Sequence, residues 1–420
     1  MKGIHFNSYI FTGKKEGCNG CGTCSQICPK SALSMHADSE GFLYPVLNHN
    51  LCVQCGLCDM RCPEVNDHSN KDGKRHSYIA TTQHENYYLE SASIGICTML
   101  SEYVINQGGI VFGCYLDETT WTAYHIGVED MREINKIRNS KYLQSDTRDS
   151  YAASKRNLNN GRLVLYIGTP CQIAGLKSYL HKEYDNLYTI DIICHGVFSP
   201  KLMPLEIAYW EKIFGSKITN FRFRSKRVYK LTNGGMVNFD VEKKGKIFHI
   251  ERFAGSSPSY HCFAYSGDGK NYNLRLSCYS CTFKSNMRYG DITVGDPWFI
   301  DDRIINNDKL ESSNIIRSLY STNTHKGWQL MQCIQSLLYQ KEYPVDETFL
   351  QPAVLFENRI IPPMRAVLYD RLNKEDYGTL VERLFSCDLE EEHRIFVLSY
   401  FINAVKFYIK QIIGYKKWKK

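Results

Sequence analysis

The sequence predicts an α+β protein with three parts: a small cysteine-rich N-terminal domain, a larger mixed α/β domain and a C-terminal helical region. Three observations lead to this prediction. A cysteine pattern occurs twice before residue 64, strand-like and helix-like segments alternate from residue 78 to residue 298, and residues 370–414 follow a helical pattern. The domains that we expect are residues 1–70, a polar linker at 71–77, residues 78–340 and residues 341–420.

Composition and charge narrow the class of protein. The chain is 43% apolar and 23% charged, which is typical of an ordered globular protein. It has 17 cysteines and begins without an apolar secretion signal, so we expect a reducing, cytoplasmic location where cysteines bind metals rather than form disulfides. The formal net charge of +7 equals that of residues 394–420 alone. A basic tail is not the basic face of a nucleic-acid-binding domain, so we expect no nucleic-acid partner.

The cysteine pattern of the N-terminal domain is an internal repeat. Residues 18–29 read CNGCGTCSQICP and residues 52–63 read CVQCGLCDMRCP, so each follows C-x2-C-x2-C-x3-C-P. Bacterial ferredoxins with two [4Fe–4S] clusters use this spacing. A zinc site leaves the third and fourth cysteines of each run without a role. The repeat therefore predicts a two-cluster ferredoxin domain.

The spacing also predicts which cysteines share a cluster. The first three thiolates of a run surround one cubane, and the fourth reaches the other cluster. One cluster is therefore expected on Cys18, Cys21, Cys24 and Cys62, and the other on Cys52, Cys55, Cys58 and Cys28. Each oxidised cluster with its four thiolates carries about −2, so the loaded domain presents an acidic face to an electron-transfer partner of the ferredoxin or flavodoxin type.

A second group of cysteines follows strand ends in the larger domain. Residues 164–167 are apolar and strand-like, and Thr169 and Pro170 then suit the N-cap and the first position of a helix. Cys171 thus lies in the first turn of that helix, where a thiolate is favoured. Cys194 ends another strand-like segment. Nothing in the sequence supports a Rossmann fingerprint or a phosphate-binding P-loop.

These cysteines can meet a C-x2-C pair, Cys278 and Cys281, because ligands gather at the carboxyl ends of strands in α/β sheets. A cluster ligand, a nucleophile and a packing residue all remain open as roles for Cys171. We interpret the other five cysteines as packing residues: Cys97, Cys114, Cys262, Cys333 and Cys387.

Several segments in a fixed order resemble the coenzyme F420 hydrogenase/dehydrogenase beta-subunit family. They extend with the ferredoxin pattern from about residue 10 to residue 300, and they are SKYLQS at 140–145, GTPCQIAGL at 168–176, IDIICHGVFSP at 190–200, FRFRSK at 221–226 and CYSCTFKSNMRYGDITVGDPW at 278–298. The resemblance implies an FAD beside a [4Fe–4S] cluster. Members exchange electrons with a deazaflavin coenzyme, and plant relatives reduce chlorophyll intermediates.

By this resemblance, Cys171, Cys194, Cys278 and Cys281 would hold a third [4Fe–4S] cluster, in which His195 or Asp296 could replace one thiolate. One segment departs from the family pattern. Residues 91–97 read SASIGIC where the family resembles Ser-x-Ser-Gly-Gly, so Ile94 stands in place of one of two glycines that would let the backbone approach a cofactor, which puts the FAD in question. The neutral explanation is that only the start of the helix differs from the family and that the cofactor pocket is unchanged.

The flavin-binding residues that we expect are Ser140, Lys141, Tyr142, Arg224 and Lys226, whose cations would hold a pyrophosphate or stabilise the reduced flavin. For Lys141 and Arg224, a solvated surface charge is the competing interpretation. His195 is the proton-transfer candidate because histidine titrates near neutral pH, and a hydrogen-bonded turn histidine is the alternative. For Asp296 we expect a turn-capping role rather than proton donation.

We therefore expect an iron–sulfur flavoenzyme that relays electrons from a donor through two clusters, and a third, to FAD and on to an unidentified small-molecule substrate. The alternative is a non-catalytic electron-transfer subunit that feeds a partner enzyme. Residues 394–413 are aromatic-rich and precede a basic end. We expect this segment to be a helix docked on the core, and the alternative is an amphipathic helix in peripheral contact with an anionic membrane through residues 394–420.

Overall fold

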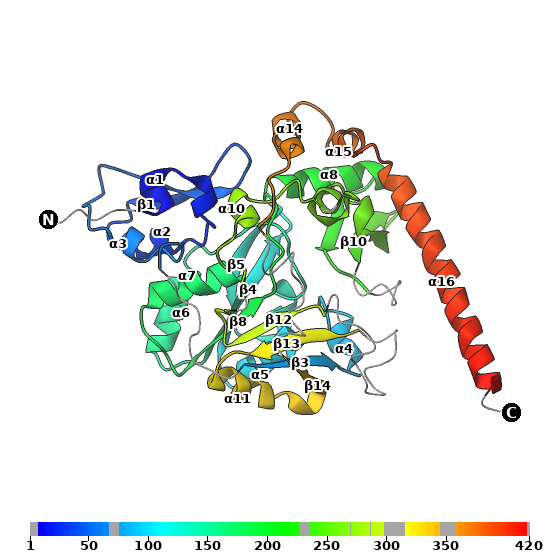
Figure 1. The fold of residues 1–420 in the computed structure, drawn as a ribbon, viewed down its shortest axis with the longest axis horizontal. Helices are drawn as coiled ribbons and strands as arrows, with labels where there is room; N and C mark the ends of the chain where they lie inside the picture. Colours follow the sequence, from blue (N-terminus) through cyan, green and yellow to red (C-terminus); the bar gives the residue numbers. More distant parts are fainter. Residues whose placement is uncertain are drawn as a thin grey trace.

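The computed structural model describes residues 7–66, 75–226, 235–297 except 269 and 286, 316–344 and 358–417. The chain forms an N-terminal ferredoxin-like domain, a mixed sheet domain and C-terminal helices, so the predicted fold class is confirmed (Figure 1).

The N-terminal domain is small and built around one hairpin. Strands β1 (Leu33–Ala37) and β2 (Leu43–Leu47) pair antiparallel, and the short helices are α1 (Tyr9–Thr12), α2 (Thr23–Ile27) and α3 (Leu57–Met60). Helices α2 and α3 each follow a glycine with positive φ, Gly22 (78°) and Gly56 (72°). These glycines lie inside the two cysteine runs, where the chain must turn sharply between consecutive ligands.

A sheet of nine strands among the described residues forms the centre of the larger domain. Its strands lie in the order β14 (Tyr339–Tyr343), β3 (His76–Thr81), β13 (Ser318–Thr322), β12 (Ile292–Gly295), β8 (Leu187–Ile192), β7 (Val164–Gly168), β4 (Ile110–Asp117), β5 (Thr122–Val128) and β6 (Ser145–Asp146). The neighbours β12, β8, β7 and β4 run parallel. Their carboxyl ends therefore meet at one edge of the sheet.

Helices cover both faces of this sheet. On β7, Val164 and Tyr166 pack with the apolar residues of α6 (Ser150–Asn159) and α7 (Pro170–Leu180). Leu165, between them, points to the opposite face and packs with α5 (Ile96–Asn106) and α11 (His325–Gln332). The continuous apolar run at 164–167 arises because a central parallel strand is buried on both faces.

A second, antiparallel sheet adjoins the first. It contains β9 (Ile218–Arg222), β10 (Met236–Lys243) and β11 (Lys246–Phe253). The other helices are α4 (Glu85–Tyr88), α8 (Leu202–Phe214), α9 (Pro258–Tyr260), α10 (Leu276–Tyr279), α14 (Pro363–Arg371), α15 (Tyr377–Phe385) and α16 (Leu389–Lys417). Phe42 and Tyr44 of the N-terminal domain share a core with residues of α8 and α14, so the ferredoxin-like domain packs against the rest of the protein.

Most local predictions agree with the elements observed, and the boundaries differ at two places. The strand at 164–168 and the helix that begins at Pro170 lie where the sequence predicted them. The predicted linker at 71–77 overlaps β3, which begins at His76, and residues 71–74 lie outside the described residues. The boundary predicted at residue 340 falls inside β14, which pairs with β3. None of the helices in the described part of the chain has the length and apolarity needed to cross a membrane.

Candidate metal centre and adjoining cationic site

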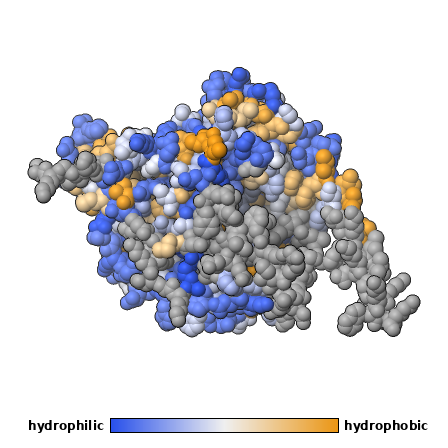
Figure 2. Space-filling model, in the orientation of Figure 1, coloured by the Kyte–Doolittle hydropathy of each residue, from blue (hydrophilic) through white to orange (hydrophobic). Residues whose placement is uncertain are grey.

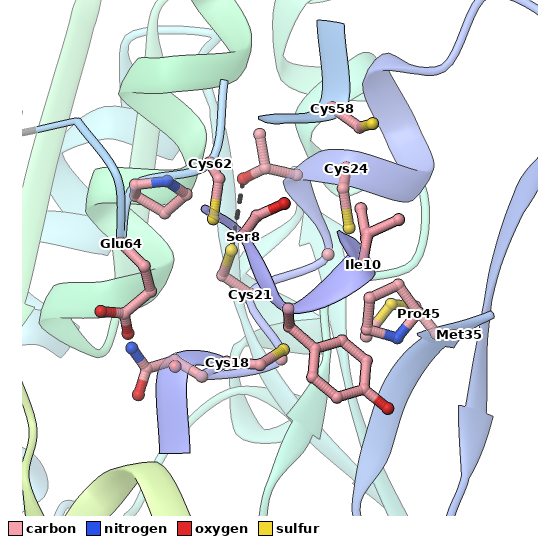
Figure 3. A pocket seen from close by; sticks show the side chains of 17 residues that line it. Ser8, Ile10, Cys18, Cys21, Cys24, Met35, Pro45, Cys58, Cys62 and Glu64 are labelled. Atoms are coloured by element: carbon pink, nitrogen blue, oxygen red, sulfur yellow. Dashed lines mark hydrogen bonds between the residues drawn. The ribbon is translucent and has the colours of Figure 1, made fainter. Parts of the chain in front are cut away.

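Four cysteines of the N-terminal domain face a common cavity. Cys18, Cys21, Cys24 and Cys62 line it together with Cys58. In Figure 3 the sulfurs of the first four surround the cavity, and the sulfur of Cys58 lies farther from them. These four are the set predicted for one cubane. Four sulfurs around one cavity fit the ligand arrangement of a [4Fe–4S] cluster, and we refer to them as the inner set.

The other predicted set lies nearer the surface. Cys55 is exposed, and Cys28, Cys52 and Cys58 are half-buried. Backbone N–H groups already donate to two of these sulfurs, from Ala32 to Cys28 (3.3 Å) and from Gln54 to Cys52 (3.4 Å). N–H···S hydrogen bonds of this kind tune the potential of a bound cluster. We refer to these four cysteines as the outer set.

Burial governs the electrostatics of the inner set. It raises the pKa of the Cys21 thiol to about 11, and it raises that of Cys24 well above its ordinary value, with further increases from Cys21 and Cys18. Thiolates crowded in a buried site need compensating positive charge, which cluster iron supplies.

The second cysteine group gathers at the carboxyl ends of the parallel strands. Cys171 follows β7 at the start of α7, and Cys194 follows β8. Gly196, with φ of 126°, brings the chain after Cys194 against Cys278, so that a Cβ built on this glycine would lie 3.3 Å from the Cys278 Cβ. Only a glycine permits this close approach.

The charges of these thiols act on one another, which places all four near one point. Burial and then Cys281 and Cys194 raise the pKa of Cys171 well above its ordinary value, which is opposite to the effect expected at a helix N-terminus. Burial and then Cys278 raise the pKa of Cys194 to about 11. These mutual effects on pKa put Cys171, Cys194, Cys278 and Cys281 within electrostatic range of one another. That they hold the third cluster implied by the resemblance stays a prediction.

Arg275 joins the inner set to the second group. The residue is fully buried and lies three positions before Cys278. Its Nε donates to the carbonyl of Cys18 (2.8 Å), and a terminal nitrogen lies 3.6 Å from the Cys18 Sγ. Its guanidinium also lies 3.9 Å from the centre of the Tyr44 ring. Sequence reasoning did not identify Arg275, and its position before the C-x2-C pair was the only available signal.

Tyr151 makes a second connection between the two cysteine groups. Its hydroxyl lies 2.9 Å from the carbonyls of both Cys21 and Gln172, the residue after Cys171. Gly175 of α7 packs beside it, and a Cβ on that glycine would lie 3.2 Å from the Cys21 Cβ. Helix α7 therefore carries Cys171 at its start and contacts the inner set one turn later.

His195 is buried in a polar environment. Asn271 donates to its Nε2 (2.9 Å), and Arg359 donates to its backbone carbonyl (2.7 Å). Burial, with added repulsion from Arg359 and Lys284, lowers the pKa of His195 to about 3. This lowered pKa favours the neutral ring near pH 7, and the proton-transfer role of His195 stays a prediction. The hydrogen-bonded alternative describes its geometry.

Two of the predicted flavin residues are lysines, of which Lys226 is buried and Lys141 is half-buried. Lys226 is fully buried and donates to the carbonyls of Tyr88 (3.0 Å), Ser91 (3.0 Å) and Ser93 (2.6 Å). Burial lowers its pKa to about 7. Because these bonds occupy all three donors of an ammonium group, Lys226 positions the segment before α5 rather than holding a phosphate directly. Lys141 donates to the Arg138 carbonyl (2.5 Å), and burial lowers its pKa to about 8.

Arg224 is also buried, so the competing interpretation of a solvated surface charge is wrong for this residue. Arg224 pairs with Asp296 at 2.6 Å. Burial acts to lower the pKa of Arg224, but the charge of Asp296 outweighs it and raises the pKa. Asp296 follows β12 at the carboxyl edge of the sheet. Its carboxylate forms an ion pair with Arg224, which the expected turn-capping role did not include.

The remaining predicted flavin residues lie beside this pair. Tyr142 packs edge-on against Phe223 and Tyr260, and Ser140 is half-buried. Ile94 is fully buried in the core beneath α5, while Gly95 retains a φ of 90°. The departure from the family pattern thus places an apolar side chain in the core and keeps the turn into α5, as the neutral explanation expects.

Two further cations that the sequence did not indicate complete this region. Arg222 pairs with Glu90. The charge of Glu90 raises the pKa of Arg138, and the charge of Arg222 lowers it. Arg222 also lowers the pKa of Lys141, so these groups are neighbours. Together with the predicted residues they make a cationic site: Arg138, Lys141, Arg222, Arg224 and Lys226, with Glu90 and Asp296 as acidic partners. Its excess of positive charge fits the pyrophosphate of a dinucleotide such as FAD.

Two models of known protein families match parts of the chain. A family model for the C-terminal part of the beta subunit of coenzyme F420 hydrogenase/dehydrogenase matches residues 161–343, and a 4Fe-4S dicluster domain model matches residues 17–66. Residues 161–343 belong to this beta-subunit family. The chain is thus an iron–sulfur protein of an electron-transferring oxidoreductase family, with a 4Fe-4S dicluster domain joined to a beta-subunit domain.

Individual proteins resemble parts of this chain. A coenzyme F420-dependent sulfite reductase of Methanocaldococcus jannaschii is 23% identical over 289 residues, 66% of this chain and 42% of that protein. An uncharacterized ferredoxin of the same organism is 39% identical over 49 residues, 12% of this chain and 62% of that protein. The chain therefore spans less than two thirds of either relative. A chain of the F420-reducing [NiFe] hydrogenase complex of Methanosarcina barkeri aligns with a TM-score of 0.39 and 14% identity, over 76% of this chain and 91% of that chain.

Proposed function

We propose that this protein is an iron–sulfur flavoprotein oxidoreductase. It takes electrons from a donor protein, passes them through two ferredoxin-type clusters and a third cluster to FAD, and delivers them to a small-molecule substrate. When bound, each cluster carries one electron at a time, and FAD collects two for the substrate.

The observation that carries this proposal is the junction between the inner set and the second cysteine group. Arg275 contacts Cys18 and lies three residues before Cys278, and Tyr151 contacts the carbonyls of Cys21 and Gln172. These buried contacts fix the two groups against each other and exclude water from the space between them. A fixed, dry junction suits electron transfer between two centres.

The outer set is the entry point in this proposal. Cys55 is exposed, whereas the four cysteines of the inner set are half-buried. Apolar side chains next to the outer cysteines in sequence are also exposed: Leu51, Val53 and Met60. An electron-carrier protein of the ferredoxin or flavodoxin type would dock here.

At the other end, the cationic site would hold the FAD. Arg138, Arg222 and Arg224 supply guanidinium groups for the pyrophosphate, while Lys226 fixes the turn into α5. The beta-subunit family and the sulfite reductase relative support a redox reaction at this end.

The test uses the full chain purified without oxygen. Bound flavin is extracted and quantified, and the protein is then mixed rapidly with a reduced low-potential ferredoxin while cluster and flavin absorbance are followed. We expect cluster bleaching to precede flavin bleaching in the wild-type protein, and Cys171→Ala to retain the first phase and lose the second. Full cluster loading without flavin would overturn the flavoenzyme proposal in favour of a non-catalytic electron-transfer subunit.

A further inference from the structure

Helix α16 extends away from the body of the protein. Figure 1 shows it leaving the second sheet and running outward to the C-terminus. Its first turns are anchored, because Glu390 pairs with Arg252, His393 Nδ1 accepts from the Phe253 backbone (3.1 Å), and Phe396 stacks on Phe253 with ring centres 4.4 Å apart. The first turns of α16 are thus docked on the core as expected, while its described side chains from Phe401 to Val405 are exposed.

One face of α16 carries an apolar stripe exposed to solvent. Its members recur at helical spacing and are 45–63% exposed: Ile395, Leu398, Phe401, Ile402 and Val405. The half-buried residues His393, Phe396 and Tyr400 lie on the opposite face, which turns toward the protein. Figure 2 shows the apolar surface at the right of the molecule, where α16 leaves the body.

The charge of this segment is strongly one-sided. Residues 394–420 contain seven Lys and Arg and no Asp or Glu. Two copies of such a segment repel each other, which disfavours pairing between two α16 helices. A negatively charged surface that also accepts apolar side chains is complementary to both features. The interfacial region of an anionic bilayer has this combination.

We propose that α16 lies on anionic phospholipid membranes, with its apolar stripe in the interfacial region, and that the net positive charge of residues 394–420 attracts it to the anionic headgroups. The bilayer then replaces water around five large apolar side chains and neutralises the basic segment. The helix rests on the membrane rather than crossing it, and its anchored first turns tie the redox domains to the surface. This inference does not depend on the proposed reaction.

The test is cosedimentation of the full chain with vesicles of mixed phosphatidylglycerol and phosphatidylcholine, or of phosphatidylcholine alone. We expect binding to the mixed vesicles, weak binding to phosphatidylcholine, and release as salt is raised. The double substitution Leu398→Glu with Phe401→Glu should weaken binding at least about tenfold, because it breaks the stripe and adds repulsion. Ile360→Glu with Val367→Glu is the matched control, since both residues are exposed and lie outside α16.

A second set of variants isolates the charge. Lys410→Gln, Lys416→Gln and Lys417→Gln together should weaken binding to the mixed vesicles at least about tenfold. Lys243→Gln, Lys244→Gln and Lys246→Gln change the charge equally at exposed positions of the β10–β11 hairpin and should leave binding unchanged. Unchanged iron content shows that each variant is folded.

Three outcomes would overturn the proposal. Equal binding to both vesicle types removes the role of anionic lipid, and binding unaffected by either α16 variant removes the role of the helix. The third outcome is that the wild-type protein does not bind vesicles but forms a dimer, and that the Leu398→Glu and Phe401→Glu variant loses this dimer. In that case a second copy of the chain covers the apolar stripe.

Discussion

The Nε of Arg275 donates a hydrogen bond of 2.8 Å to the backbone carbonyl of Cys18, although 257 positions separate the two residues in the chain. The same guanidinium donates to Gln144 Oε1 (3.2 Å). A single buried side chain thus connects the ferredoxin-like domain to the segment that carries Cys278.

Replacing this arginine should affect both stability and redox behaviour. Arg275→Met removes the side-chain donor to the Cys18 carbonyl and a buried charged group with its hydrogen bonds, so we expect the free energy of unfolding to fall by about 2 to 4 kcal/mol. Loss of a positive charge beside Cys18 should also lower the reduction potential of the inner cluster. Redox titration followed by electron paramagnetic resonance measures this shift. Lys201→Met, at an exposed contact between the domains, is the control and should leave the potential unchanged.

Removing one partner of the ion pair between Arg224 and Asp296 should lower the free energy of unfolding. Asp296→Asn leaves a buried guanidinium without its opposing charge, and we expect a loss of about 3 to 5 kcal/mol in the free energy of unfolding. Denaturant unfolding measures the change. Asp149→Asn, which removes the acidic partner of an exposed pair with Arg156, should have no measurable effect. Equal effects of the two substitutions would contradict the buried environment of Arg224.

Replacing Lys226 should lower the flavin content of the protein and leave its iron content unchanged. Lys226→Met removes three hydrogen bonds that hold the segment before α5, so we expect flavin affinity to fall at least about tenfold. Flavin and iron per chain are measured on the same preparation, and iron should be unchanged. Lys212→Met, at an exposed lysine, is the control. A parallel loss of iron would show that the substitution disrupts the fold as a whole.

His125 should make the protein sensitive to mild acid. Burial lowers its pKa to about 4, while its ring contacts Ser145 Oγ (2.7 Å) and the Ile167 carbonyl (3.2 Å). The unfolded chain takes up a proton near pH 6.5 and the folded chain does not. Stability therefore falls as the pH drops from about 6.5 to about 4, by up to about 3 kcal/mol from this residue.

Melting temperatures across this pH range check the prediction. His125→Gln should remove that part of the acid sensitivity, and His325→Gln, at an exposed histidine, should retain it. Parallel curves for wild type and His125→Gln would show that His125 does not contribute.

Local patterns in the sequence predicted much of the fold. The strand at 164–168, the start of α7 at Pro170 and both cysteine runs depend on neighbouring residues, which a sequence displays directly. Cys171 and Cys194 were placed at one sheet edge because parallel strands end together. Their proximity in the structure follows from that same rule.

Contacts between distant segments were not predictable in this way. The sequence does not show that Arg275 reaches Cys18, or that Lys226 is buried against the carbonyls before α5, because burial of a charge depends on partners distant in the chain. For Cys333, the sequence predicted burial and the structure shows exposure. It follows an apolar helical pattern and was interpreted as a packing residue, yet it is exposed at the C-cap of α11.

The iron content of protein purified without oxygen tests the central claim most directly. With three clusters, the wild-type chain should contain about twelve irons and Cys171→Ala about eight, while Cys97→Ala should match the wild type. About eight irons in the wild-type chain, or no loss in Cys171→Ala, would contradict a third cluster and the relay that depends on it.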